Sequence, residues 1–392
     1  MRRLVPALAL LAFLGGCSLD DEPSSSRPPQ LGVEEPEDQE AVEELLFPSS
    51  ATRNTVRVGG SDAAADAAGV AAALFPATGT SDRPTAVVMV DQDDWQSGIA
   101  ASVLAGPPIG APILLSDGDQ LPAVTEDALE RLAPRGSDLS QDAQVIRIGP
   151  DVARPDGFKT ALIRGENPYQ RAAAIDRFFS AARGRPSNDV VLYSGERAAW
   201  AMPAATWAAR SGDAVLPVEA DSIPAPVARA IGAHERPNVY LLGPERIISE
   251  QVASRLRQRG LARSVNRIEG PTPVENAIAF ARYEKGDFGW RVNIPGYNFA
   301  IASTTRPADA AAAAALGTRG VFAPLLLSDD PEQLPAPLET YLLSVQPGYE
   351  GDPRDAVYNR AWILGDDAAI SLRQQAQVDT VTELIPVQPI AP

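Results

Sequence analysis

The chain has almost none of the residues on which most metal sites and many catalytic sites are built. Its 392 residues contain one histidine, His234, and one cysteine, Cys17. A Ser-His-Asp triad would use His234 as its base, but no Gly-x-Ser-x-Gly accompanies it, so we interpret it as a surface residue of a loop. With no histidine pair at ligand spacing, we expect no metal site, no cofactor and no catalytic residue. An all-carboxylate calcium site remains an alternative around Asp91, Asp93 and Asp94. The spacing of these residues lacks the glycine and glutamate of an EF-hand loop.

Positive charge is also scarce, and it is almost all arginine. Lys159 and Lys285 are the only lysines, and the formal net charge is −17. Such a chain has no general footprint for nucleic acid and is not attracted to anionic lipid, so we expect no nucleic-acid partner. One basic run stands out, and its arginines are suited to phosphate and carboxylate groups. The run could bind an anionic polymer, or it could be the solvated face of a helix. Its candidate polymer-binding residues are Arg255, Arg257, Arg259 and Arg263.

The apolar run at the amino terminus, Leu4–Phe13, is too short to span a bilayer as a helix. It follows two arginines and precedes Leu14-Gly15-Gly16-Cys17, which resembles a lipobox, in which the cysteine is lipidated and becomes the mature amino terminus. An ordinary signal peptide is the alternative. We predict a lipoprotein signal peptide over residues 1–16 and an extracytoplasmic, wall-facing protein anchored to the membrane through Cys17. Since the lipid takes the only cysteine, the mature chain has no disulfide.

Residues 17–53 are rich in proline, serine and acidic side chains. Low hydrophobicity together with like charge is typical of disorder and self-repulsion. We therefore predict a lipidated, disordered acidic tether that holds the folded part of the chain away from the membrane.

The remaining sequence repeats itself three times. The phrases PILLSDGDQLP (112–122) and PLLLSDDPEQLP (324–335) are nearly the same, and Gly60, Gly165 and Gly270 are each 105 residues apart. Each glycine ends a short strand pattern and precedes a helix, and every repeat continues with apolar strands separated by helices. Continuous apolar strands of this kind indicate parallel sheets covered on both faces. We predict an α/β fold of three tandem Rossmann-like repeats over residues 54–157, 158–263 and 264–392.

The glycines of RVGGSDAA (57–64) lie between a strand and a helix, where phosphate-binding loops are found. The stretch is not a complete Gly-x-Gly-x-x-Gly or Walker motif. Ser61 or Asp62 would occupy the free amide groups as the helix cap. We therefore favour a helix cap over a phosphate site.

With the arginine before each repeat glycine, the small-residue helix and the "PILLS" strand, residues 54–387 resemble the cell wall-binding repeat 2 family. The resemblance implies a pseudo-three-fold arrangement of the repeats, export to the bacterial surface and non-covalent binding of anionic wall polymers. It implies polymer-binding roles for Arg57, Arg164, Arg267 and Asp309. Arg164 is displaced toward its glycine, and Ser97 and Trp200 stand where the other repeats would have the counterpart of Asp309. The second arginine of the family motif is replaced by Ala63, Pro168 and Pro273.

These features predict a non-catalytic cell-envelope lipoprotein that binds cell wall polymer or glycan and tethers the membrane to the wall. A solute-binding lipoprotein that captures a small molecule in an interdomain cleft is the first alternative, although three repeats do not match two similar lobes. An enzyme on a Rossmann-like frame is the second, and the missing catalytic constellation argues against it.

Overall fold

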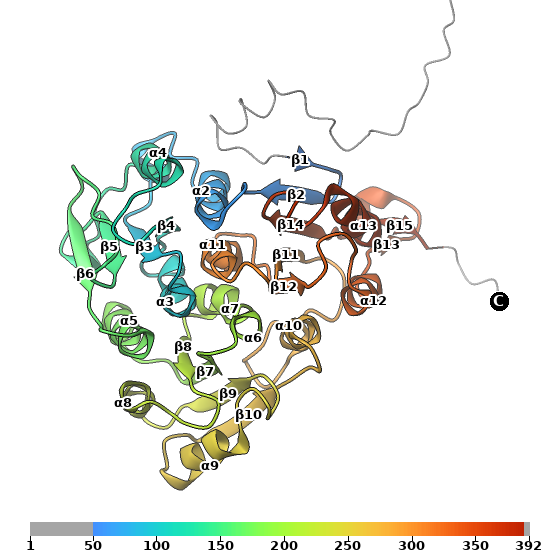
Figure 1. Cartoon of the computed structure of the whole chain (residues 1–392). Helices are drawn as coiled ribbons and strands as arrows, with labels where there is room; N and C mark the ends of the chain where they lie inside the picture. Colours follow the sequence, from blue (N-terminus) through green and yellow to red (C-terminus); the bar gives the residue numbers. More distant parts are fainter. Residues whose placement is uncertain (1–49, 388–392) are drawn as a thin grey trace, which may run out of the picture.

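The computed structural model describes residues 50–387. The predicted signal peptide, the lipidation site Cys17 and most of the predicted tether lie outside these residues. Within the described part of the chain, no helix combines the length and the apolar composition needed to cross a membrane. The described chain forms three α/β units arranged around a common centre (Figure 1).

The first unit is built on a parallel four-stranded sheet in the order β4-β3-β5-β6. All residues of β4 and all but the last of β3 are buried, as expected for strands covered on both faces. Helices α2 and α4 pack together against this sheet, and α3 lies toward the centre of the molecule (Figure 1). The elements are α2 (Ala63–Leu74), β3 (Val87–Asp91), α3 (Trp95–Ala101), β4 (Ile113–Ser116), α4 (Ala123–Leu132), β5 (Val145–Ile148) and β6 (Thr160–Ile163).

The second unit repeats this plan with a parallel sheet in the order β10-β9-β7-β8. Helix α5 packs against both α8 and β8, and α6 and α7 lie toward the centre. The elements are α5 (Pro168–Arg183), β7 (Asp189–Ser194), α6 (Ala198–Ala201), α7 (Ala204–Ser211), β8 (Ala214–Val218), α8 (Ala225–Ala233), β9 (Asn238–Leu242), α9 (Glu250–Gln258) and β10 (Ser264–Ile268).

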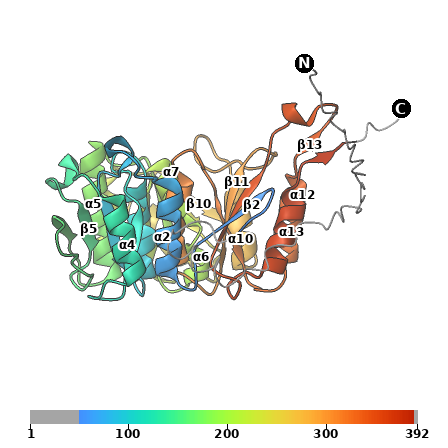
Figure 2. The same cartoon turned by 90° about the horizontal axis from the view of Figure 1, so that it is seen from above.

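The third unit has a sheet in the order β1-β2-β14-β11-β12, parallel except for the short edge strand β1. A separate pair of short strands, β13 and β15, projects from this unit (Figure 2). The elements are β1 (Ser50–Ala51), β2 (Thr55–Val58), α10 (Pro273–Arg282), β11 (Asn298–Ser303), α11 (Asp309–Ala312), β12 (Leu325–Ser328), α12 (Ala336–Ser344), β13 (Gly348–Tyr349), β14 (Arg360–Leu364), α13 (Leu372–Thr382) and β15 (Ile385–Pro386).

The three sheets exchange strands around the ring. The first strand of each sequence repeat lies at the edge of the sheet of the repeat before it: β6 pairs with β5, and β10 pairs with β9. The first repeat obeys the same rule through β2, which pairs with β14 at the far end of the chain, with Thr55 beside Ala361. This pairing joins the beginning and the end of the folded region, so the three repeats form a closed ring.

Small residues occupy the centre of the ring. Short 3-10 helices, 102–105 after α3 and 313–317 after α11, both pack on α7. A methyl group added at Gly106 would lie 2.2 Å from the carbonyl oxygen of Ala209, and one at Gly317 would lie 2.1 Å from that of Thr206. Only glycine permits such close approach. The predicted fold, three Rossmann-like α/β repeats with parallel sheets covered by helices, is confirmed.

The glycine at the start of each repeat is required for a similar reason. A Cβ atom at Gly165 would lie 2.6 Å from the amide nitrogen of Arg171, and one at Gly270 would lie 2.4 Å from that of Asn276. Each glycine lets the chain pass close to the first turns of the helix that follows. Those helices begin with side-chain caps, and Asp62 accepts a hydrogen bond from the amide of Ala65, so Asp62 acts as the cap that the sequence favoured.

Candidate functional site

Two of the arginines with predicted polymer-binding roles hold loops inside the protein. Arg57 on β2 is only 3% exposed and donates hydrogen bonds to the carbonyl oxygens of Gly365 (2.6 Å), Asp366 (2.9 Å) and Ile370 (2.6 Å). Its Nε also donates to Gln375. A guanidinium has five N–H groups, and these bonds direct it to the loop that follows β14. The structure therefore gives Arg57 a structural role in place of the predicted polymer contact.

Arg267 on β10 occupies the corresponding position in the third repeat. It donates to the carbonyl oxygens of Gly243 and Ile248, at 2.8 Å each, and so holds the loop that follows β9. Its side chain is mostly buried, and its Nη2 atom lies 3.9 Å from Glu250. Arg267 therefore also serves the fold, and its exposed fraction is too small for a principal polymer contact.

The second repeat replaces this arginine with one from the neighbouring strand. Leu162 on β6 stands at the position that Arg57 and Arg267 occupy, and it pairs with Arg147 on β5. Arg147 donates from Nε to the carbonyl oxygens of Val152 and Ala153, at 3.0 Å each. Because Arg147 supplies these donors, Arg164 is not needed for the loop, and it is exposed.

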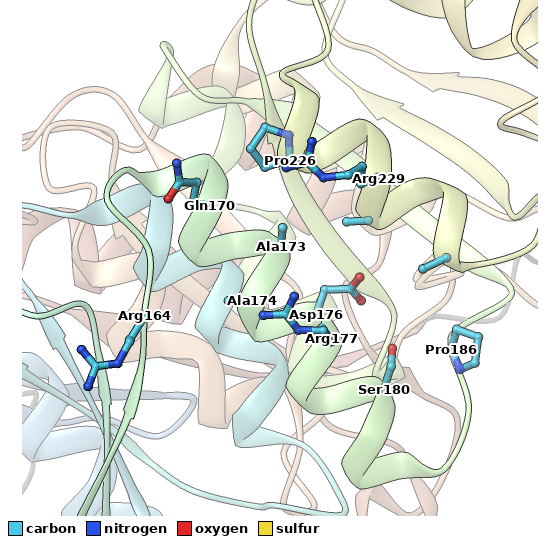
Figure 3. Close-up of a pocket in the computed structure, with 12 residues that line it drawn as sticks. Arg164, Gln170, Ala173, Ala174, Asp176, Arg177, Ser180, Pro186, Pro226 and Arg229 are labelled. Carbon is cyan, nitrogen blue, oxygen red and sulfur yellow. The ribbon is translucent and has the colours of Figure 1, made fainter.

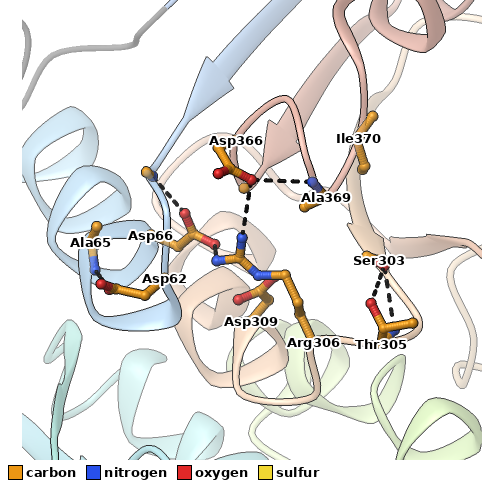
Figure 4. A network of polar contacts seen from close by, with 12 residues as sticks. Asp62, Ala65, Asp66, Ser303, Thr305, Arg306, Asp309, Asp366, Ala369 and Ile370 are labelled. Atoms are coloured by element: carbon orange, nitrogen blue, oxygen red, sulfur yellow. Dashed lines mark hydrogen bonds and ion pairs between the residues drawn. The ribbon is translucent and has the colours of Figure 1, made fainter. Parts of the chain in front are cut away.

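Asp309, the fourth residue in the predicted polymer-binding set, belongs to a buried cluster that joins the first and third repeats (Figure 4). Arg306 lies among three carboxylates: its Nη2 is 2.5 Å from Asp66 on α2, its Nε is 3.1 Å from Asp309, and its Nη1 is 3.7 Å from Asp366. Both Asp66 and Asp309 are 0% exposed. No polymer can reach Asp309, so its role is to close the ring.

The carboxyl groups of this cluster have shifted acidities. Burial raises the pKa of Asp309 to about 6, and the positive charge of Arg306 limits the rise. Burial, followed by the negative charge of Asp309, raises the pKa of Asp66 well above its ordinary value. One arginine cannot fully compensate for the carboxylates around it, so this junction takes up protons more readily than isolated aspartates would.

The position that Asp66 occupies carries a different residue in each of the other two repeats. The residue six positions after each repeat glycine is Asp66 in the first repeat, Arg171 in the second and Asn276 in the third. Asp66 and Arg171 each bond a side chain of the preceding repeat. Asn276 instead accepts a hydrogen bond from the amide of Gly270 in its own repeat, at 3.1 Å. Arg171 bonds Asp94 (2.7 Å) and Ser97 (2.8 Å), so the signs of the charges are reversed relative to the Asp66–Arg306 pair. Ser97 thus stands at a junction, as Asp309 does, which matches the equivalence expected from the sequence.

An open groove lies between α5 and α8 in the second repeat (Figure 3). It has a volume of about 710 Å³. Arg164 lies on the segment that leads into α5, Arg177 lies on α5 itself, and Arg229 lies on α8. Alanine and proline side chains form the apolar part of the wall. The residues lining the groove are Arg164, Gln170, Ala173, Ala174, Asp176, Arg177, Ser180, Pro186, Pro226, Arg229, Ala230 and Ala233.

The three groove arginines keep their positive charge available. All three are exposed, and none forms an ion pair or a side-chain hydrogen bond within residues 50–387. Asp176, the acidic residue of the groove lining, is bound to His234 instead. A polyanion in the groove would therefore meet unneutralised guanidinium groups, which suit phosphate and carboxylate oxygens. Of the residues that the family resemblance proposed, Arg164 is the one that lies in this groove.

The net charge of each repeat, counted from the sequence, also favours the second repeat as the place of an anion-binding site. Residues 158–263 contain 15 arginines and lysines against 10 acidic residues, a net charge of +5. Residues 54–157 contain 6 against 15, a net charge of −9, and residues 264–392 contain 9 against 16, a net charge of −7. This asymmetry is the signal that could have directed attention to Arg177 and Arg229 before the structure was known.

The basic run of the sequence lies on α9 and the turn after it, and it is only partly free. Arg255 donates to the carbonyl oxygen of Asp221 (2.9 Å), and Arg257 bonds Glu250 (2.5 Å). Arg259 and Arg263 are exposed and form no ion pair within the described part of the chain. The run therefore adds positive charge to the second repeat, but its charges are not gathered in the groove.

His234 differs from its interpretation as a surface loop residue. It forms the carboxyl-terminal cap of α8, is only 5% exposed, and is hydrogen bonded through both ring nitrogens.

The acidic stretch considered for calcium has partners within the protein. Asp91 accepts hydrogen bonds from the amides of Asp93 and Gly118, and Asp94 bonds Arg171. Within residues 50–387, no group of three or more metal-binding side chains is placed to hold an ion.

The fold and groove together define a closed ring of three Rossmann-like units with one basic member. The chain is similar to two solved structures from Clostridium difficile. Cwp6 matches with a TM-score of 0.66 and 17% sequence identity over 85% of this chain and 48% of that chain. Cwp8 matches with a TM-score of 0.63 and 18% identity over 84% of this chain and 52% of that chain.

This likeness shows a shared fold, and the chain spans about half the length of the structures that it matches. No family model matches the chain, and no curated protein matches it.

Proposed function

We propose that the protein is a non-catalytic lipoprotein of the cell envelope that binds an anionic cell wall polymer through the groove between α5 and α8. The observation that carries this proposal is the concentration of positive charge in the second repeat, with Arg164, Arg177 and Arg229 unpaired along one groove. A lipid on Cys17 would hold one end of the chain at the membrane, and the groove would hold the wall.

Electrostatics explains how an acidic protein could bind an anionic polymer. Salt screens charges on the surface over about 8 Å at physiological ionic strength. The acidic first and third repeats therefore contribute little to the electrostatic potential in the groove, and the nearby arginines dominate it. A polymer has an advantage over a single small anion, because several of its charged groups can engage several arginines at once.

The structural neighbours support a role at the cell surface, since Cwp6 and Cwp8 are cell wall proteins. The groove is also open to solvent, and its alanines and prolines offer an apolar surface that could contact sugar rings.

Co-sedimentation with purified cell walls tests the proposal. We expect residues 18–392 to bind walls at low salt, and to lose binding when the secondary polymers are extracted or when salt is raised. Replacing Arg164, Arg177 and Arg229 with alanine should weaken binding roughly tenfold to a hundredfold, because each exposed charge contributes up to about 1 kcal/mol.

A matched control removes three exposed arginines from the other repeats, Arg135, Arg154 and Arg373. Both triple variants lose the same formal charge, so a loss confined to the groove variant identifies the site. Equal losses in the two variants, or no binding of the unaltered chain to any wall preparation, would contradict the proposal.

A further inference from the structure

The only histidine of the chain lies beneath the proposed polymer groove. His234 Nδ1 is 2.9 Å from the carbonyl oxygen of Ser187, and its Nε2 is 3.0 Å from both carboxylate oxygens of Asp176. Asp176 lies on α5 next to Arg177 and lines the groove on the side of α5 that faces α8, which carries Arg229 (Figure 3). His234 itself is buried and is hydrogen bonded to Asp176, a residue of the groove lining.

The partners of the ring determine its protonation. A backbone carbonyl oxygen can only accept a hydrogen bond, and an ionised carboxylate can only accept. Both ring nitrogens of His234 must therefore donate, which requires the doubly protonated imidazolium. A neutral imidazole carries one N–H and would leave one of these contacts without a proton.

The direction of the pKa shift agrees with this geometry. Burial acts to lower the pKa of His234, but the hydrogen bond and negative charge of Asp176, the Ser187 carbonyl and the charge of Asp213 outweigh burial and raise it. Asp213, in the loop between α7 and β8, accepts hydrogen bonds from Ser187 (2.6 Å) and Trp207 (3.1 Å).

The other charged groups near His234 belong to α5, α8 and the turn after α8. Glu235 and Arg236 follow it in the turn after α8 and are exposed, and Arg229 lies on α8, five residues before it. Arg177 adjoins Asp176 on α5, and Arg164 lies before α5. The charge that a ligand meets therefore depends on whether the proton on His234 balances Asp176.

We propose that His234 sets the charge of the groove: while it is protonated, it neutralises Asp176 and the groove binds anions, and when it loses its proton as the pH rises, Asp176 repels them. This inference rests on the proposed function, because it concerns the same groove. It makes His234 a residue that acts through Asp176 and does not touch the polymer.

The expected effect follows from Coulomb's law. One unit charge at a distance of about 8 Å, with an effective dielectric constant between about 20 and 80, changes the affinity for each bound anionic group by roughly twofold to thirtyfold. We expect binding to weaken roughly tenfold between pH 6 and pH 9. The midpoint of this change should coincide with the titration of His234.

The first measurement is a nitrogen-15 NMR titration of the unaltered chain, in which the single histidine gives an unambiguous signal. We expect both ring nitrogens to carry protons at pH 6, and the titration midpoint to lie above that of a histidine in an unfolded peptide. A neutral ring at pH 6 would overturn the proposal without any variant.

The second measurement is the affinity for dextran sulfate, whose charge does not change between pH 6 and pH 9. Asp176→Asn removes the carboxylate that holds the proton on His234, so burial should keep the ring neutral throughout this range. The variant should therefore bind dextran sulfate with the same affinity at both ends of the range. His234→Gln should bind at pH 6 as weakly as the unaltered chain binds at pH 9. Asp151→Asn removes an exposed carboxylate from the first repeat and should leave the pH dependence unchanged.

Cell walls, used beside dextran sulfate, separate the two proposals. If walls bind but neither ligand responds to the titration of His234, the inference is wrong and the proposed function stands. If dextran sulfate binding follows His234 while walls do not bind at any pH, the inference stands and the proposed function fails. If Asp176→Asn keeps the pH dependence, another group is responsible and the inference is overturned.

Discussion

Replacement of Asp309 by asparagine should stabilise the protein at pH 8 more than at pH 4.5. Asp309 has a pKa of about 6 in the folded protein, whereas an aspartate in an unfolded chain has a pKa of about 3.9. The folded state thus holds the proton more tightly. The contribution of protonated Asp309 to the stability of the fold is fully present below about pH 4 and is lost as the pH rises through about 6.

The size of the effect follows from these two values. A difference of about 2 units corresponds to about 3 kcal/mol, and about 2 kcal/mol of this is lost between pH 4.5 and pH 8. Asparagine keeps the shape of the side chain and carries no charge at either pH. Arg306 keeps Asp66 and Asp366 as partners. The stabilisation of Asp309→Asn relative to the unaltered chain should therefore be about 2 kcal/mol larger at pH 8.

Thermal unfolding followed by tryptophan fluorescence gives the measurement. With an unfolding entropy of about 2.1 cal/mol/K per residue, a chain of this length should show about 3 °C of extra Tm gain at pH 8. Asp329→Asn, which removes an exposed carboxylate from the same repeat, is the matched control. If Asp309→Asn changes Tm by the same amount at both pH values, the carboxylates do not compete for Arg306 as described.

Three further predictions concern the ring and its charges. Gly317→Ala should lower the free energy of unfolding by several kcal/mol, because the new methyl group would lie 2.1 Å from the Thr206 carbonyl oxygen. Gly232→Ala, whose methyl group would meet nothing nearer than 3.9 Å, should not lower it, and urea unfolding of the two variants tests the difference. Arg147→Met should destabilise by about 2 to 3 kcal/mol, since the carbonyl groups after β5 lose their donor, and added protease should then cleave the 149–154 loop faster. Arg257→Ala should leave wall binding nearly unchanged in co-sedimentation, because Arg257 is paired with Glu250; a loss as large as that of the groove variant would place the polymer on α9.

The sequence predicted the repeating architecture because burial and close packing restrict the residue types at neighbouring positions. Strands covered on both faces must be apolar throughout, as β3 and β4 are. Close contacts near the start of a helix demand glycine, which explains why Gly60, Gly165 and Gly270 recur at the same place in each repeat. The cap at Asp62 was likewise readable, since a cap bonds an amide only three residues away.

The candidate site could be predicted only in part, because it joins segments that are distant in the sequence. Arg164 was identified through the family resemblance, but Arg229 reaches the same groove from 65 positions farther along the chain. The charge of the second repeat was present in the sequence as a count. A count does not show that three arginines remain unpaired along one surface, since that depends on where every carboxylate lies.

By itself, therefore, the sequence determined the number of repeats, their α/β character and the local caps, all of which follow from contacts between near neighbours. Only the tertiary structure decided which sheet each repeat's first strand joins, because the apolar pattern of β2 fits an edge of its own sheet as well as that of another. It also decided that Arg57 and Asp309 are buried in the closed ring while Arg164 faces solvent. The same residue type can hold a loop or meet a ligand, and long-range packing alone separates the two roles.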